Sequence, residues 1–291
     1  MILVDYNQVM LASLFASIGN HHNVELDENL LRHMFLNSIR FNRKKFTEEF
    51  GEIVLCVDTR DVWRRDYFPY YKANRKKNRD DSDLDWPKLF EVIGQIREEI
   101  HENFPYKVVQ VDRCEADDII ATLAHRARDA GGRVTIVSSD KDLMQLVGGG
   151  VEMLDPMKNK RIDRDGVFEK FGVYPDRVVD VQALAGDAVD NVPGAPGIGI
   201  KTAALLINEF GSLEALLDRA GEIKQPKRRE TLIENRAQIE LSKRLVSLDC
   251  DMPLDVTLEA LEVRAPEADR LLGFLTEMEF RSLTRRIAEA L

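Results

Sequence analysis

The feature that most limits the possible folds of this chain is a set of carboxylates placed at the ends of short apolar runs. Three of these runs, 2–4, 53–57 and 134–137, have the length and composition typical of buried strands. In a parallel sheet the carboxyl ends of such strands meet at one edge, where open α/β folds bind their ligands. The nine acids are Asp5, Asp58, Glu115, Asp117, Asp118, Asp140, Asp142, Asp187 and Asp190.

So many acids at one edge of a sheet could not all stay ionised without cations, because like charges raise one another's pKa. Carboxylate ligands without paired His or Cys residues favour Mg²⁺ or Mn²⁺ over Zn²⁺. Two such ions would suit phosphodiester hydrolysis, because they can hold both the attacking and the leaving oxygen. The pattern therefore predicts a metal-dependent enzyme.

Each acidic cluster taken alone has a simpler explanation. Acids at 115–118 favour the positive end of a helix dipole. The cluster at 138–142 fits a helix N-cap followed by a solvated turn, and the cluster at 186–191 fits a polar turn. Three such clusters together with Asp5 and Asp58 make coincidence a poor explanation.

Strand and helix patterns alternate through the first 180 residues or so, which predicts an α/β fold with a central, mostly parallel sheet flanked by helices. We expect an α/β catalytic domain at 1–185 and a helical domain at 186–291. The segment 60–85 is expected to be locally disordered or mobile. The expected strands are 2–5, 53–58, 107–111 and 133–138, with an edge strand at 151–154; helices are expected from Leu26 through Phe35, from Trp86, from Glu115 and, briefly, after Asp142.

The bulk composition leaves the class of partner open. The net charge of -10 argues against nucleic acid only if the charges are evenly spread, and here acids and bases are gathered in separate segments. The three cysteines form no C-x-x-C pair, which predicts reduced thiols and a cytoplasmic location. Asp5 interrupts the apolar start, so no signal peptide or membrane span is expected.

A basic and aromatic stretch spans residues 63–79, with five aromatic residues between 63 and 71. Bases that alternate with aromatics can provide phosphate contacts and stacking faces for single-stranded nucleic acid. A solvated charged helix is the alternative explanation, and it is usually the better one for a run of charge. The density of aromatic residues favours the functional interpretation.

A glycine-rich loop precedes Lys201 and Thr202. A nucleotide-binding P-loop needs Lys directly after its last glycine, but Ile200 intervenes here and the preceding pattern is helical. The loop better suits a helix–hairpin–helix, in which backbone N–H groups approach a DNA phosphate at a helix N-terminus. The glycines alone are equally consistent with a plain tight turn.

Together these residues resemble the 5′-nuclease or flap-endonuclease superfamily, and the resemblance covers essentially the whole chain. From about 114 onward the motifs are similar to those of the 5′-nuclease domain of bacterial DNA polymerase I. The first 110 or so residues resemble the phage-type ribonuclease H of the same superfamily, notably at 36–39 and 63–66. This mixed resemblance suggests the hypothesis of a hybrid with a seam near 112–114.

The resemblance implies a role for each matching residue. Asp5, Asp58, Glu115, Asp117 and Asp140 look like ligands of a first metal ion. Asp142, Asp187 and Asp190 resemble an outer group for a second ion, with Asp118 supporting. The basic segment 60–85 resembles a helical arch with Lys72 and Arg75 at its base, where they contact the scissile phosphate, and Arg64 resembles another phosphate contact below the arch. The implied DNA contacts are Arg65, Tyr71, Lys76 and Lys77 in the arch, and Gly197, Gly199, Lys201 and Thr202 in the helix–hairpin–helix, where a K⁺ ion is common in the family.

The predicted function is that of a Mg²⁺-dependent 5′-3′ exonuclease and 5′-flap endonuclease that leaves 5′-phosphates, with Mn²⁺ as a substitute ion. Its expected partners are DNA with 5′ ends, flaps or nicks, RNA–DNA hybrids that carry primers, and a replication polymerase or clamp; the chain is expected to be a monomer. Two alternatives stay open. One is a metal-dependent ribonuclease of the PIN type, and the other is a non-catalytic protein that binds DNA junctions.

Overall fold

The computed structural model describes residues 1–18, 26–263 and 265–289 of the chain. Its strands form one sheet in the order β3-β2-β1-β4-β5-β6, parallel except for β6, which runs antiparallel to β5. The predicted strand at 151–154 is therefore present, but its placement at the edge is wrong, because β6 lies outside it. The strands are β1 (Ile2–Asp5), β2 (Ile53–Val57), β3 (Lys107–Gln110), β4 (Val134–Val137), β5 (Val151–Asp155) and β6 (Lys160–Ile162).

Successive residues of a strand point to opposite faces of the sheet. Both faces are apolar here, and both are covered by helices. Ile2 and Val4 pack with helices α1, α2 and α5, whereas Leu3 and Val54 pack with α6 and α7. The α/β topology is confirmed, although α1 was not predicted. The bounds are α1 (Tyr6–Ile18), α2 (Glu28–Phe50), α5 (Trp86–Asn103), α6 (Ala116–Asp129) and α7 (Arg164–Phe171).

Side-chain caps set the start of two of these helices. Asp27 accepts a hydrogen bond from the backbone N–H of Leu30, so α2 begins one residue later than Asp27 and continues to Phe50. Asp85 caps α5 in the same way, and Pro87 lies in the first turn, as the sequence predicted. Among the described residues, no helix is long and apolar enough to cross a membrane.

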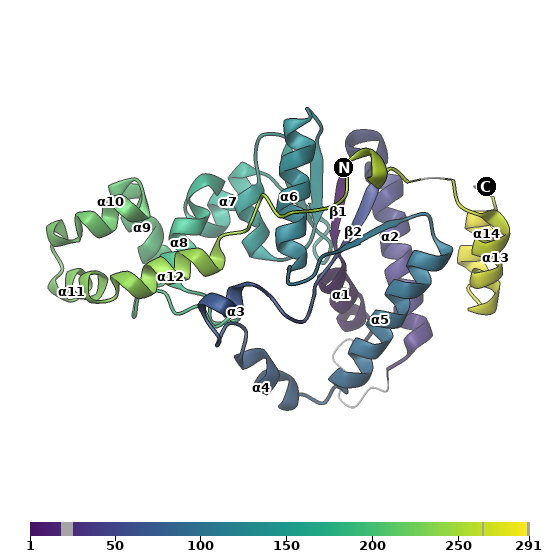
Figure 1. The fold of residues 1–291 in the computed structure, drawn as a ribbon, viewed down its shortest axis with the longest axis horizontal. Helices are drawn as coiled ribbons and strands as arrows, with labels where there is room; N and C mark the ends of the chain where they lie inside the picture. Colours follow the sequence, from purple (N-terminus) through teal and green to yellow (C-terminus); the bar gives the residue numbers. More distant parts are fainter. Residues whose placement is uncertain (19–25, 264, 290–291) are drawn as a thin grey trace.

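The arch, residues 60–85, carries two short helices, α3 (Arg64–Tyr67) and α4 (Asn74–Asp80). In Figure 1 the chain leaves β2, runs outward through α3 and α4, and returns to the sheet at α5. The segment predicted to be locally disordered or mobile therefore has helical structure, and its inner end is held by hydrogen bonds from Lys72 N to Asp190 O and from Asn191 Nδ2 to Tyr70 O.

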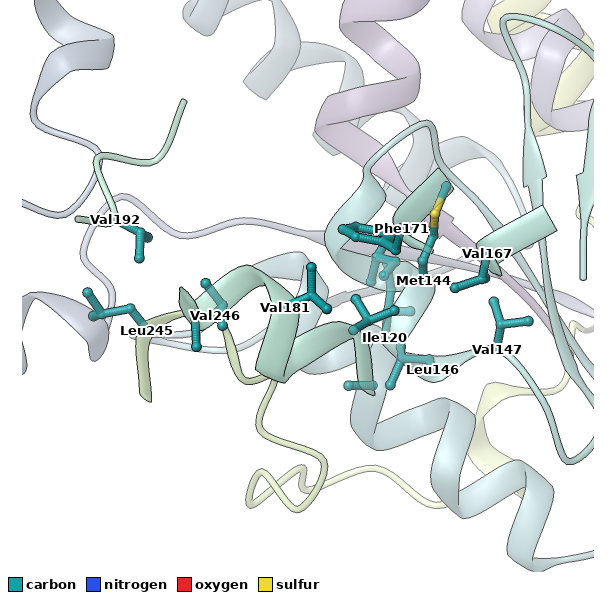
Figure 2. Close-up of a cluster of buried hydrophobic side chains, with 14 of the residues drawn as sticks. Ile120, Met144, Leu146, Val147, Val167, Phe171, Val181, Val192, Leu245 and Val246 are labelled. Atoms are coloured by element: carbon teal, nitrogen blue, oxygen red, sulfur yellow. The ribbon is translucent and has the colours of Figure 1, made fainter. Parts of the chain in front are cut away.

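Helices α8 to α12, called here the helical lobe, extend from one side of the sheet (Figure 1). A continuous apolar core joins the lobe to the sheet: Figure 2 shows Ile120 of α6, Val181 of α8 and Leu245 of α12 in one cluster. The bounds are α8 (Val178–Ala185), α9 (Ile200–Phe210), α10 (Leu213–Asp218), α11 (Pro226–Glu234) and α12 (Arg236–Val246).

The last two helices, α13 (Ala268–Glu277) and α14 (Arg281–Ala288), lie on the opposite side of the molecule from the lobe (Figure 1). Leu271, Phe274 and Leu283 belong to the apolar cluster that covers the α1, α2 and α5 face of the sheet. Phe274 packs edge-on against Phe104, just past the end of α5, with their ring centroids 5.8 Å apart. Residues 268–288 are thus part of the layer around the sheet.

A close backbone crossing shapes the loop between α8 and α9. Gly186 and Gly194 both have positive φ angles, and a Cβ atom built on Gly194 would lie 2.3 Å from the backbone nitrogen of Gly186. The N–H of Gly194 donates to the buried Ser242 hydroxyl of α12 at 2.9 Å, and Ala195 N donates to Leu184 O. Glycine is required here because both the backbone conformation and the space exclude a side chain.

We expect Gly194→Ala to lower the free energy of unfolding by at least about 2 kcal/mol, because the new methyl group would push against backbone that cannot move aside. Urea unfolding followed by circular dichroism measures this. Gly221→Ala is the matched control, because its added Cβ meets nothing within 4 Å and should change stability by no more than about 0.5 kcal/mol. Equal stabilities for the two variants would contradict the expected role of the crossing.

Candidate active site

The fold brings the predicted acids to the carboxyl edge of the sheet. Asp5 ends β1, Asp58 follows β2, and Asp140 follows β4 as the N-cap of a short 3₁₀ helix, η1 (Lys141–Leu146). Asp117 lies in the first turn of α6, and Glu115 is the residue that precedes this helix. The parallel strands alone bring together only Asp5, Asp58 and Asp140. The N-terminus of α6 adds Glu115 and Asp117.

Burial and mutual repulsion govern the ionisation of this inner group. Burial, followed by repulsion from Asp58 and Asp140, raises the pKa of Asp5 to about 8. The pKa of Asp117 is raised well above its usual range by burial and then by Asp140 and Asp5. The pKa of Asp58 is also raised, with burial as the main cause. These shifts show that the predicted inner acids lie near one another in a poorly solvated place.

An outer group of acids lies beside the inner one. Burial, followed by repulsion from Asp140, raises the pKa of Asp142 to about 6, and Asp187 and Asp190 contribute further repulsion. Asp187 and Asp190 are both buried, in the loop that follows α8. Lys141 forms ion pairs with Asp187 and with Asp142, the latter at 3.2 Å. The structure thus places the predicted second set next to the first, with Asp140 between them.

Whether these acids suit a metal can be judged from their donors and their charge. All the candidate ligands are carboxylate oxygens, the type preferred by hard divalent cations, and their raised pKa values show that positive charge would stabilise them. Among the described residues, no three acids are arranged to hold an ion as they stand. Basic side chains hold some of the oxygens instead, since Lys72 pairs with Glu115, Arg75 with Asp190 and Lys141 with Asp187. The donor set therefore fits divalent cations in its chemistry.

Lys72 and Arg75 lie at the base of the arch and point to the acids. Burial alone would raise the pKa of Glu115, but the neighbouring cations Lys72 and Arg64 lower it to about 2. Lys72 has a positive φ angle of 57°, a conformation uncommon outside glycine, and this turn directs its ammonium group inward. The two residues predicted to contact the scissile phosphate are therefore beside the carboxylates.

Arg64 and Asp118 differ from their predicted roles. Arg64 is 1% exposed, and all five of its N–H groups are engaged by Glu115, Asp118 and the carbonyls of Leu245 and Ser247, at 2.6 to 2.9 Å. Asp118 is fully buried, and its two oxygens accept from Arg64, from Trp63 Nε1 and from Asp249 N. In this arrangement Arg64 has no donor left for a phosphate, and Asp118 has no free oxygen facing the other acids.

The predicted DNA contacts fall into two groups. Tyr71 is 5% exposed and points its hydroxyl to Glu115 Oε2 at 3.2 Å, so its ring offers no open face to a base. The other predicted DNA contacts lie at or close to the surface of the molecule. Arg65, Lys76, Lys77, Gly197, Gly199 and Lys201 are exposed, and Thr202 is half-buried.

Several polar residues that hold the acids were missed by the sequence reasoning. Ser138 Oγ donates to Asp5 Oδ2 at 3.1 Å, and Asp140 N donates to the same hydroxyl at 3.0 Å. Asn7 Nδ2 donates to Asp58 Oδ2 at 3.1 Å, and Gln182 Nε2 donates to Asp142 at 2.5 Å. Ser138 could have been found from its place at the end of a strand next to Asp140, whereas Gln182, 40 residues from its partner, gave no such signal.

A cavity of about 570 Å³ opens beside the outer acids. Asp140, Asp142 and Asp187 line this cavity, together with the basic residues Lys158 and Lys160. The outer acids thus line a hollow that they share with several basic side chains.

Comparisons with known proteins show the family of the chain. The protein-family model for the N-terminal, resolvase-like domain of 5′-3′ exonucleases matches residues 1–172, and the model for their C-terminal SAM fold matches residues 173–269. The chain therefore belongs to the 5′-3′ exonuclease family, and the predictions of its fold class and enzyme class are confirmed. The first model runs through the seam proposed near 112–114, so the residues on both sides of that seam belong to one domain of this family.

Among curated proteins, the chain is 50% identical over 229 residues to DNA polymerase I of Rhizobium leguminosarum, a match that covers 79% of this chain and 22% of the relative. It is 33% identical over 293 residues to DNA polymerase I of Caldicellulosiruptor bescii, covering 99% of this chain and 33% of that protein. The chain thus spans a third or less of these relatives' length.

Among solved structures, T5 5′-exonuclease with bound divalent metal ions (zinc) superimposes with a TM-score of 0.72 at 20% identity, covering 96% of this chain and 97% of that one. Human GEN1 in complex with Holliday junction DNA gives a TM-score of 0.56 at 14% identity, covering 96% and 67%. These likenesses show the shared fold.

The raised pKa of Asp5 predicts how stability depends on pH in the absence of metal. The folded protein binds a proton at Asp5 up to about pH 8, whereas an unfolded aspartate releases it near pH ~4. Between these values the folded state binds more protons, so its stability falls as the pH rises. We expect the Tm in EDTA to fall from about pH 5 to about pH 8, and Asp5→Asn to weaken this dependence. A Tm that rises across this window in the unchanged protein would contradict the expectation.

Proposed function

We propose that this protein is a divalent-cation-dependent 5′-3′ exonuclease and 5′-flap endonuclease, with Mg²⁺ as the natural ion and Mn²⁺ as a substitute. The observation that carries the proposal is the convergence of buried acids with raised pKa values beside the basic base of the arch. T5 5′-exonuclease binds divalent metal ions (zinc), and T5 D15 flap endonuclease forms a complex with DNA and metal ions, which supports both parts of the proposal by analogy.

The inner acids would hold one cation and the outer acids, Asp142, Asp187 and Asp190, a second. Bound there, the cations would supply charge neutralisation for the phosphodiester and lower the pKa of the attacking water. Lys72 and Arg75 would leave their present carboxylate partners and donate to the non-bridging oxygens of the scissile phosphate, where negative charge develops. Ser138 and Asn7 would keep Asp5 and Asp58 in fixed orientations throughout.

The N-terminus of α9 would hold the duplex beside the site. Cβ atoms built on Gly197 and Gly199 meet nothing within 4 Å, so a phosphate can approach the backbone closely. No side chain caps this helix and no acid lies in its first turn, which leaves its N–H groups and its dipole open to an anion. A K⁺ ion at this helix–hairpin–helix is part of the proposal.

The first test is cleavage of a 5′-flap duplex with mapped products. We expect Mg²⁺-dependent release of the flap with a 5′-phosphate on the product, and loss of activity in EDTA. Asp140→Asn should lower kcat by about 100-fold or more, because Asp140 lies between the two groups of acids. Asp129→Asn is the matched control, since Asp129 is exposed at the far end of α6, and it should leave kcat unchanged.

Other outcomes of the same assay would favour the alternatives. Preferential cleavage of single-stranded RNA would favour the PIN-type ribonuclease. Tight binding of junctions without metal-dependent cleavage would favour a non-catalytic binding protein. The apolar contact between the lobe and the sheet favours the nuclease, because it joins α9, the proposed duplex-binding helix, to the domain that carries the acids.

Lys201→Gln tests the duplex contact separately. Lys201 is exposed in the first turn of α9, and the charge-neutral variant should weaken binding of duplex DNA while leaving the rate on single-stranded 5′ ends unchanged. Binding can be followed by fluorescence anisotropy, and single-strand cleavage by gel electrophoresis. An equal loss on both substrates would count against a duplex-specific contact.

Finer aspects of the proposal concern partners and location. The named relatives are DNA polymerase I proteins, which supports action beside a replication polymerase or clamp at nicks and at RNA primers. The three cysteines are unpaired, which is in keeping with a cytoplasmic location, and we propose that the chain acts as a monomer.

A further inference from the structure

The resemblance assigned a phosphate contact at the base of the arch to Arg64, but the structure buries that guanidinium and occupies all its donors. Moving Arg64 to a phosphate would strip Glu115 and Asp118 of a buried positive partner, at a large cost in free energy. The phosphate contact that the resemblance assigned to Arg64 must therefore come from another basic group, in addition to Lys72 and Arg75.

Arg244 of α12 lies over the same indole ring as Arg64. The guanidinium carbons of Arg64 and Arg244 are 4.4 Å and 4.8 Å from the centroid of Trp63. Arg244 is also 5.0 Å from the ring of Tyr67, which stands edge-on to Trp63 and is 54% exposed. The two rings hold the outer guanidinium by cation–π contacts, which leave its N–H edges available.

The charges around Arg244 distinguish it from the other basic residues of its helix. Arg236 pairs with Asp218 and Glu240, and Lys243 pairs with Asp180 and Glu214. Arg244 is exposed and, within the part of the chain that the structure describes, has no carboxylate partner. An unpaired, exposed guanidinium held by contacts with two aromatic rings is well prepared to bind a phosphate oxygen.

We infer that Arg244, and not Arg64, is the guanidinium that contacts a backbone phosphate of the nucleic acid where the arch meets α12. This inference rests on the proposed function for the identity of the ligand. Arg64 is then a positioning residue: it fixes Glu115 and Asp118 and ties α3 to the carbonyls of Leu245 and Ser247 at the end of α12. Trp63 contacts both arginines. Both guanidinium groups lie over its ring, and its indole N–H donates to Asp118.

The test measures binding of a 5′-flap duplex in EDTA, where cleavage is absent, over a series of KCl concentrations from about 50 to 300 mM. The slope of log K against log salt concentration counts the ions released by phosphate contacts. Arg244→Gln should make this slope less negative by about one. Arg236→Gln is the matched control, since this neighbour on the same helix is already paired with acids, and its slope should equal that of the unchanged protein.

Arg64→Lys and Arg64→Gln should lower the Tm but leave the slope unchanged in the protein that remains folded. An unchanged slope for Arg244→Gln, or a slope less negative by about one for either Arg64 variant, would overturn the inference.

The protein without substitutions distinguishes failure of this inference from failure of the proposed function. If it binds and cleaves the flap while Arg244→Gln keeps the full slope, only the inference fails; if it neither binds nor cleaves, the proposed function fails and the inference with it.

Discussion

Repulsion among the buried acids at the carboxyl edge of the sheet is the constraint on which the rest of the structure depends. Burial, and then repulsion from neighbouring acids, raises the pKa of Asp5 and of Asp117, so positive charge at this edge stabilises the folded chain. In the structure as it stands, that charge comes from the arch and from η1, through Lys72, Arg75 and Lys141. Since these side chains can exchange one anionic partner for another, the same electrostatic demand that holds the arch inward also makes the site attractive to cations and phosphates.

The supporting parts of the molecule serve to hold these charges in place. Arg64 crosses from the arch to α12, and Ser242 of α12 binds Gly194 in the loop that carries Asp187 and Asp190. Two segments of the site are therefore anchored on one helix, although they are more than 100 residues apart in the sequence. The negative total charge of the chain is compatible with an anionic substrate, because nine of the acids are gathered at the site and exposed bases such as Lys76 and Lys201 lie outside it.

Much of this arrangement could be predicted from the sequence, because strand ends and helix starts are set by local patterns. Asp5, Asp58 and Asp140 follow apolar runs of strand length, so their meeting at one edge follows from a parallel sheet. The direction in which a side chain points could not be predicted from these local patterns. Tyr71 and Arg64 belong to a basic, aromatic run, yet both turn inward, because their partners come from α6 and α12. The helix α1 was missed since its apolar residues extend to Phe15, which is 48% exposed, and so do not form one clean stripe.

The central position of β1 has a consequence for how the chain acquires its fold. This strand pairs with β2 on one side and with β4, more than 100 residues later in the sequence, on the other. During synthesis its second edge must remain unpaired until residues 134–137 have left the ribosome, and the apolar face under α5 is completed only when α13 arrives. Contacts of such long sequence separation slow folding and prolong the exposure of strand edges. The topology that gathers the acids therefore also makes the nascent chain dependent on protection from aggregation until most of it has been made.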